Sequence, residues 1–179
     1  VLQGRYVRLE GLNTEKHYRT LYENFKNTPR IFEYMLEPDL TTLEEWRERC
    51  HQKEKDETRF HFVVEKLDCP NDYVGIVCLS RLNPANRTLE GGLTTFSYKL
   101  KRTQAATETG YLMFAYAFDE LGYIRGEGRT SPNNKAINRA LERGGLKREG
   151  LFRSFLVCDG YAIDVLWYVI LRDMWPPIK

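Results

Sequence analysis

A short basic segment in the middle of the chain carries residue types that bind phosphate. An extended run ends at Tyr98, and three cations follow it: Lys99, Lys101 and Arg102. The small residues Ala105 and Ala106 come next and open a helical run. Backbone N–H groups at a helix start have no partner inside the helix, and the helix dipole places positive charge there. The segment therefore predicts an anion site, with merely solvated side chains as the alternative.

The helix that follows this segment is strongly patterned. Its apolar residues share one face at helical spacing: Tyr111, Phe114, Ala115, Phe118 and Leu121. Gly122 comes directly after this face and is expected to end the helix. We therefore expect a helix over residues 105–121 whose first turn faces the basic loop.

The rest of the pattern predicts an α/β chain of one domain, residues 1–179. Strands are expected over seven runs: 5–10, 59–67, 73–82, 88–98, 124–129, 147–157 and 162–171. Other helices are expected after Thr14, after Thr41 or Thr42, and from Asn134 to Gly144 and Gly145. The Gly91-Gly92 pair suggests a bulge or a close backbone approach in its strand. The order is β-α-α-β-β-β-α-β-α-β-β, without internal repeats.

Composition gives no support for several classes of partner. The 27 Lys and Arg residues nearly balance 25 Asp and Glu residues, so we expect no nucleic-acid partner. No apolar run reaches transmembrane length and the start lacks a signal-peptide pattern, so no membrane is expected either. The chain starts at Val1 rather than at a methionine, as expected if a few residues have been trimmed or lost.

Cysteines and histidines are scattered along the sequence. Four cysteines lack any paired spacing: Cys50, Cys69, Cys78 and Cys158. We interpret them as reduced thiols of a cytoplasmic protein and expect no disulfide and no metal site. Three dispersed histidines are interpreted as structural or exposed: His17, His51 and His61.

The residue order of the basic segment points to a family. Residues 102–108 read Arg-Thr-Gln-Ala-Ala-Thr-Glu, which closely resembles the acetyl-CoA loop of the GNAT acyltransferase superfamily. Its form is similar to the branch that includes the Rim-type ribosomal-protein N-terminal acetyltransferases. Most of the superfamily has glycines where this chain has Gln104 and Ala106. Further strings resemble this branch over nearly the whole chain: Glu90-x-Gly92, residues 116–123, 145–153 and 164–168, and Trp175-Pro176.

The resemblance implies the GNAT fold, a mixed, mostly antiparallel central sheet with helices on both faces. It also implies acetyl-CoA as cofactor, with its pyrophosphate on the loop residues Arg102, Thr103, Gln104, Ala105, Ala106 and Thr107. The strand ending at Tyr98 would part from the strand at 124–129. Backbone groups around Phe96 and Tyr98 would then line the pantetheine arm, while both rings pack in the core. Asn134, expected as a helix N-cap, would contact the cofactor arm.

Acetyl transfer to an amine needs a proton acceptor, and Glu90 is the best candidate. It lies in the middle of its strand beside Gly91-Gly92, where a carboxylate would be partly buried. The family often uses a carboxylate at this place, acting directly or through water. The alternative is an edge-strand glutamate held in a salt bridge.

Several departures from the branch pattern leave room for altered chemistry. Ile137 stands where the branch usually has serine, and Leu141 where other members have a tyrosine that protonates the thiolate. Gly128 replaces a usual aromatic residue, and Ile163 replaces a usual arginine. A thiolate leaves readily, so the loss of an acid need not abolish transfer.

We expect acetyl transfer to a primary amine, on a small molecule or at a protein N-terminus, by direct attack on the thioester. The acceptor would approach over the first two helices and residues 31–37, where Phe32, Tyr34 and Trp46 suggest apolar contacts. All three could instead be core residues. Two rivals remain: a GNAT-fold binding module that has lost transfer, and a biosynthetic enzyme of other chemistry. A monomer or a homodimer is expected.

Overall fold

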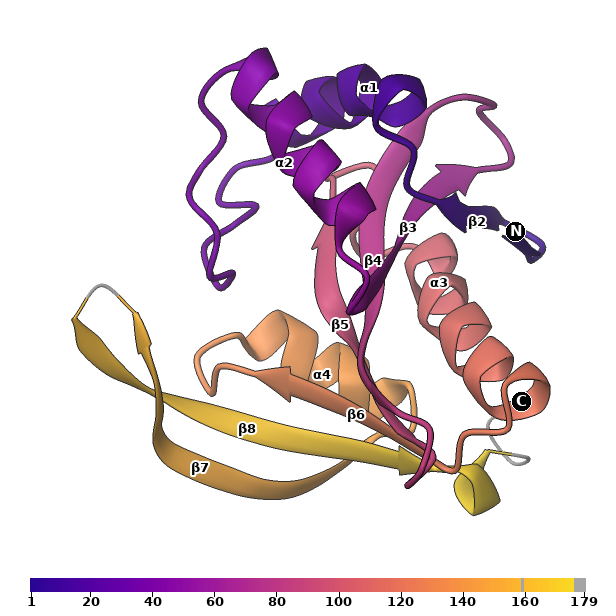
Figure 1. The fold of residues 1–179 in the computed structure, drawn as a ribbon, viewed down its shortest axis with the longest axis vertical. Helices are drawn as coiled ribbons and strands as arrows, with labels where there is room; N and C mark the ends of the chain where they lie inside the picture. The colour runs from indigo at the N-terminus through magenta and orange to yellow at the C-terminus, as the bar shows by residue number, and fades with distance from the viewer. Residues whose placement is uncertain (159, 176–179) are drawn as a thin grey trace.

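The computed structural model describes residues 1–158 and 160–175 and shows a twisted sheet with helices on both faces (Figure 1). Asp159, between the strands expected over 147–157 and 162–171, and Pro176, of the Trp175-Pro176 string, lie outside the described residues. Within those residues, every helix is too short or too polar to cross a membrane.

Eight strands form the sheet in the order β1-β2-β3-β4-β5-β6-β8-β7. Their bounds are β1 Leu2–Gln3, β2 Val7–Gly11, β3 Arg59–Lys66, β4 Tyr73–Asn83, β5 Thr88–Phe96, β6 Arg125–Thr130, β7 Lys147–Cys158 and β8 Tyr161–Leu171. Neighbours are antiparallel except for β5 and β6, which are parallel. The expected fold and element order are confirmed, with the two-residue β1 as an addition.

Four α-helices connect these strands: α1 Thr14–Lys26, α2 Leu43–Lys55, α3 Gln104–Ala115 and α4 Lys135–Arg143. A π-helix, Tyr116–Glu120, continues α3, and Gly122 ends the run with a φ of 72°. Asn13, not Thr14, caps α1, because the Asn13 side chain accepts a hydrogen bond from the Lys16 N–H. Thr42 and Asn134 cap α2 and α4 as expected.

The two faces of the sheet are covered by different helices. The α3 side is the larger core, in which Met113, Phe114 and Phe118 pack against strand residues such as Leu89. On the other face α1 and α2 pack over β3 and β4, with Trp46 at the centre. Apolar burial of this kind is the main stabilising term of the fold.

The sheet opens between β5 and β6. Only three residue pairs join these strands, and the last is Glu90 with Glu127. Beyond it β5 bulges, because Leu93 and Thr94 together lie opposite Val77, and Leu93 has a φ of 46°. The bulge therefore follows the Gly91-Gly92 pair rather than coinciding with it. Gly91 instead provides a close approach, since a Cβ there would lie 3.2 Å from the Phe114 ring.

Candidate active site

The start of α3 has two free backbone donors. Thr103 caps the helix: its hydroxyl accepts from the Ala106 N–H at 3.2 Å and donates to the Leu100 carbonyl at 2.7 Å. Ala105 is buried at 4 % exposure, so it offers only its backbone. In the described part of the chain, the N–H groups of Gln104 and Ala105 have no acceptor. The N–H groups of Gln104 and Ala105 can therefore donate hydrogen bonds to an anion, whereas the N–H group of Ala106 is already bound.

The cations of this loop differ in their availability. The Lys99 ammonium lies 2.8 Å from an Asp72 carboxylate oxygen, and this hydrogen-bonded pair raises the pKa of Lys99. Arg102 is exposed and adopts a φ of 62°, and Thr107 is exposed one turn into α3. Arg102 is therefore better placed than Lys99 to meet a bound anion.

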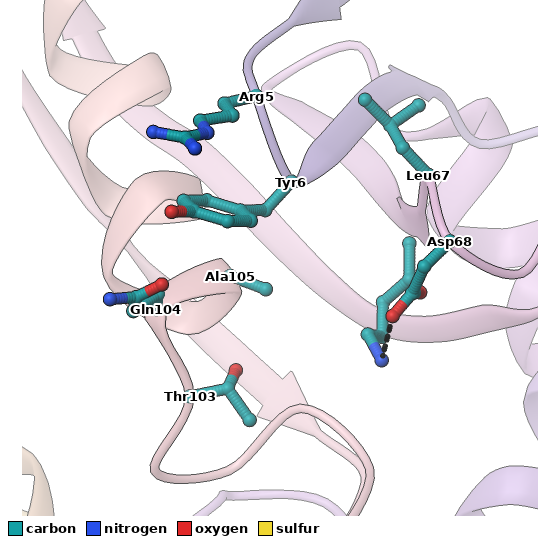
Figure 2. Close-up of a pocket in the computed structure, with 8 residues that line it drawn as sticks. Arg5, Tyr6, Leu67, Asp68, Thr103, Gln104 and Ala105 are labelled. Atoms are coloured by element: carbon teal, nitrogen blue, oxygen red, sulfur yellow. Dashed lines mark ion pairs between the residues drawn. The ribbon is translucent and has the colours of Figure 1, made fainter.

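A cavity of about 240 Å³ lies beside the start of α3 (Figure 2). Three segments line it: Arg5, Tyr6, Lys66, Leu67, Asp68, Thr103, Gln104 and Ala105. The Lys66 ammonium lies 3.0 Å from the Asp68 carboxylate, whereas the Arg5 guanidinium lies over the Tyr6 ring, 5.4 Å from its centroid. Arg5 thus adds a positive group close to the free donors of α3, which the sequence did not indicate.

Glu108 ties the N-terminal turn to α3. Its carboxylate accepts hydrogen bonds from the N–H groups of Arg5 at 2.7 Å, Tyr6 at 2.7 Å and Val7 at 2.9 Å. A Cβ at Gly4 would lie 2.4 Å from the same carboxyl group, so a larger residue there would displace the Glu108 carboxylate. The last residue of the Arg-Thr-Gln-Ala-Ala-Thr-Glu string is therefore a structural clamp, a role missed in the sequence.

The residues expected beside the cofactor arm lie at the end of β5, just beyond it, and at the start of α4. Phe96 ends β5, and its half-buried ring packs on the α3-side core. Tyr98 lies beyond the sheet: its N–H donates to the Thr28 hydroxyl at 3.0 Å and its ring is 55 % exposed. The expectation of a buried Tyr98 ring is wrong, because the chain has already turned into the loop. The Asn134 side chain accepts from the Ile137 N–H at 3.3 Å as the α4 cap.

Glu90 lies at the last pair before β5 and β6 separate, and only 6 % of its surface is exposed. Its carboxylate is held by Arg129 through two contacts of 2.9 Å, and Arg81 is 3.8 Å away. The salt bridge that the sequence left open is present, but β5 is a central strand and not an edge. Neither arginine was singled out from the sequence, because they belong to different strands.

The α4 residues that replace usual polar groups are packed as apolar side chains. Ile137 and Leu141 are both half-buried. Leu141 lies over Gly128, where a Cβ would be 3.7 Å from its methyl groups. The two departures at Gly128 and Leu141 thus fit one another, and this side of the gap is apolar.

The three aromatic residues expected to meet the acceptor have unlike environments. Phe32 and Trp46 are 3 % and 1 % exposed and belong to the core under α1 and α2, which is the alternative left open above. Tyr34 is 46 % exposed, and its hydroxyl donates to the Asn133 carbonyl at 3.4 Å. Of the three, Tyr34 alone offers an accessible ring.

The buried cysteines and histidines have structural environments. Burial raises the pKa of the Cys50 and Cys78 thiols to about 12, so both are neutral. His17 is buried and hydrogen-bonded to Glu10 at 3.0 Å, and burial lowers the pKa of His61 to about 4. Among the described residues, no cluster of His, Cys, Asp and Glu side chains could hold a metal ion.

Comparison with known proteins agrees with this architecture. Residues 7–147 match the family model described as "Acetyltransferase (GNAT) domain". The chain is 28% identical over 161 residues to "Probable N-acetyltransferase YjcK" of Bacillus subtilis (strain 168), covering 87% of this chain and 83% of that protein.

Solved structures give the same result. A GCN5-related N-acetyltransferase from Brucella melitensis superimposes with a TM-score of 0.93 at 32% identity, over 99% of this chain and 81% of that one. Spermidine N-acetyltransferase from Vibrio cholerae, in complex with CoA and spermine, shares the fold at a TM-score of 0.75 and 20% identity, over 94% and 97% of the two chains. The chain belongs to the GNAT family of acetyl-CoA-dependent N-acetyltransferases.

Proposed function

We propose that this chain acetylates a primary amine at the point where β5 and β6 part, with Glu90 as the proton acceptor. The observation that carries the proposal is the end of the β5–β6 ladder at Glu90 and Glu127. The buried carboxylate of Glu90 therefore lies where the two strands begin to separate. β5 then runs on from Glu90 into the loop that exposes the free donors of α3, so one continuous segment joins both parts of the site.

Acetyl-CoA supplies the acetyl group as a thioester. The amine nitrogen bonds to the carbonyl carbon while the carbon–sulfur bond breaks, and the sulfur leaves as a thiolate that takes a proton from solvent. Glu90 accepts the proton released by the nitrogen, directly or through one water molecule, and later returns it to solvent. The chain's main contribution is to hold the two reactants in position.

Cofactor binding is assigned to backbone groups more than to side chains. The N–H groups of Gln104 and Ala105 would hold the pyrophosphate, with the Arg102 guanidinium beside them. The unpaired edge of β5 at residues 91–96 would line the pantetheine arm, and Asn134 would approach it from α4. Thr103, Ala106 and Thr107 shape this loop.

The acceptor would enter from the sheet face that α1 and α2 cover. Glu90 pairs with Ser80 across β5 and β4, on the face that α1 and α2 cover further along the sheet. Tyr34 would line this entrance, with Phe32 and Trp46 supporting the segment from beneath. The Rim-type form of residues 102–108 supports a protein N-terminus as the second candidate acceptor. Cys50, Cys69 and Cys78 are free thiols, which favours a reducing, cytoplasmic location.

The test is calorimetric titration with acetyl-CoA, followed by thiol release and product mass across a panel of primary amines and peptides. We expect saturable cofactor binding and an N-acetylated product from at least one amine. Absence of binding at millimolar acetyl-CoA would overturn the cofactor assignment. Binding with no turnover of any amine would overturn the transferase assignment in favour of a binding module.

A further inference from the structure

The sheet face next to Glu90 carries an excess of positive charge. Arg81 from β4 and Arg129 from β6 share a single carboxylate, that of Glu90. The Arg81 side chain is 53% exposed and that of Arg129 is 25% exposed, whereas that of Glu90 is 8% exposed. The group therefore carries one net positive charge, and its cations face outward while its anion is covered.

The other carboxylates of this face are already engaged. Glu127 and Glu149 both bind Arg125, at 2.7 and 2.5 Å. Asp164 accepts a hydrogen bond from the Ser154 N–H at 2.8 Å. No further ion pair to Arg81 or Arg129 is present among the described residues. One positive charge of this group is thus left available to an anionic group from outside.

An exposed aromatic surface adjoins these arginines. Trp167 is the cross-strand neighbour of Arg129, and the guanidinium carbons of Arg129 and Arg81 lie 5.3 and 5.8 Å from its ring centroid. Phe152 and Phe155 contact the same ring, with centroids 5.1 and 5.7 Å away. They remain 46% and 39% exposed.

A bulge in β7 makes this surface possible. The pairing of β7 with β8 jumps from Phe152 and Val165 to Leu156 and Ile163, so β7 contains two extra residues. The distortion lets Phe152 and Phe155 pack on each other, with centroids 5.7 Å apart, as well as on Trp167. Bulges are over-represented next to active sites, where they redirect side chains.

We propose that the acceptor is an amine that also carries a carboxylate and an apolar side chain, of which a free hydrophobic amino acid is the simplest case. This inference rests on the proposed function. The carboxylate binds Arg81 and Arg129, and the side chain packs on Phe152, Phe155 and Trp167. The amine lies by Glu90 and reacts as described above: nitrogen gains the acetyl carbon, sulfur leaves, and the proton passes to Glu90. A polycationic amine would instead meet two guanidinium groups and be disfavoured.

The decisive comparison is phenylalanine against phenylalaninamide. They differ in the group beside the amine, a carboxylate in one and a neutral carboxamide in the other. The amide also has the less basic amine, so its amine is more often neutral at pH 7. We expect kcat/KM to be about 10- to 100-fold higher for phenylalanine, as for the loss of a charge-assisted contact. Spermidine should be turned over more slowly than either. Because the pair of charges is partly exposed, the preference should shrink as salt rises.

Arg81→Gln should reduce this preference about 3- to 10-fold. Arg87→Gln is the matched control, since Arg87 is an exposed arginine of the same β4–β5 hairpin with a similar φ, 52° against 50°. It should leave the preference unchanged. A second readout, independent of turnover, is calorimetric binding of N-acetylphenylalanine and its amide to the CoA-loaded protein.

The outcomes separate the two proposals. Equal kcat/KM for acid and amide, or a faster amide, would overturn this inference and leave acetyl transfer standing. Carboxylate-dependent binding without turnover of any amine would support the site and overturn the proposed activity. A preference that Arg81→Gln and Arg87→Gln change equally would also count against the assignment of Arg81.

Discussion

The two sides of the β5–β6 gap are built in different ways. On the cofactor side, one continuous segment, residues 96–107, offers mainly backbone N–H groups at the start of α3. On the acceptor side, Arg81, Glu90, Arg129 and Trp167 come from four strands and act through their side chains. The first design uses backbone groups, so it should tolerate changes of side chain such as Gln104 and Ala106 in place of glycine. The second depends on each single residue, so variants on the two sides should differ in kind.

Glu90→Gln should have the largest effect, on turnover and not on cofactor binding. The amide keeps the shape but cannot accept the proton, so we expect kcat to fall about 100-fold or more at neutral pH. The loss should shrink at high pH, where the amine deprotonates unaided. Stopped assays over a pH series, with acetyl-CoA calorimetry beside them, measure both quantities.

Glu127→Gln is the control for this variant. Glu127 is the register partner of Glu90 and is likewise bound by an arginine, Arg125, at 2.7 Å. It should change kcat little. A Glu90→Gln enzyme with an unchanged rate at every pH would move the base elsewhere or leave deprotonation to solvent.

Arg102→Glu should act on the cofactor side alone. Reversing a charge beside the free N–H groups should weaken acetyl-CoA binding about 10- to 100-fold, in a salt-dependent way. The maximal rate at saturating cofactor should stay within a few fold. Arg87→Glu, another exposed arginine with positive φ, should leave the affinity unchanged. Equal losses in both variants would remove Arg102 from the site.

The same contrast explains what could be read from the sequence. The element order, the caps Thr42 and Asn134, and the loop at 102–108 are local patterns, so they were predictable. The bulge in β7, the Arg129–Glu90 pair and the Glu108 clamp depend on residues that are separated in the sequence and that only the fold brings together. Phe32 and Tyr34 show the same limit: both are aromatic, but only the fold decides which is buried.

His61 should make the stability of the protein depend on pH in the acidic range. Burial lowers its pKa from 6.5 to about 4, so the unfolded chain binds the proton first as pH falls. The free energy of unfolding should therefore decrease between pH 6.5 and 4, by up to about 3 kcal/mol, and be unaffected by this group above pH 6.5. His61→Phe should remove that component from urea unfolding curves, whereas His51→Gln, at a half-exposed site, should retain it. Identical pH slopes for wild type and His61→Phe would contradict the assignment.

Glu108→Gln should loosen the cofactor side by removing its clamp. Gln cannot accept three N–H bonds with equal strength, and we expect a loss of about 2 kcal/mol in unfolding free energy. Acetyl-CoA affinity should fall modestly with it, because the start of α3 shifts, while kcat at saturating cofactor is retained. Glu120→Gln, at an exposed position of the following π-helix, is the control. Undiminished stability would show that the three hydrogen bonds contribute nothing net.

Leu141→Tyr should have the smallest effect on the rate. It tests whether the enzyme lacks a general acid because this part of α4 is apolar. A thiolate leaves readily, so restoring a phenol should change kcat at most a few fold. The larger side chain must fit over Gly128 and beside Leu146, and overpacking there should lower stability by about 1–3 kcal/mol. Melting temperatures must therefore be read with the rates. A stable Leu141→Tyr protein that gains about 100-fold in kcat would show that the lack of a general acid limits the rate of the unaltered protein. A protein that still binds acetyl-CoA, yet stays inert toward every amine, would favour a binding module.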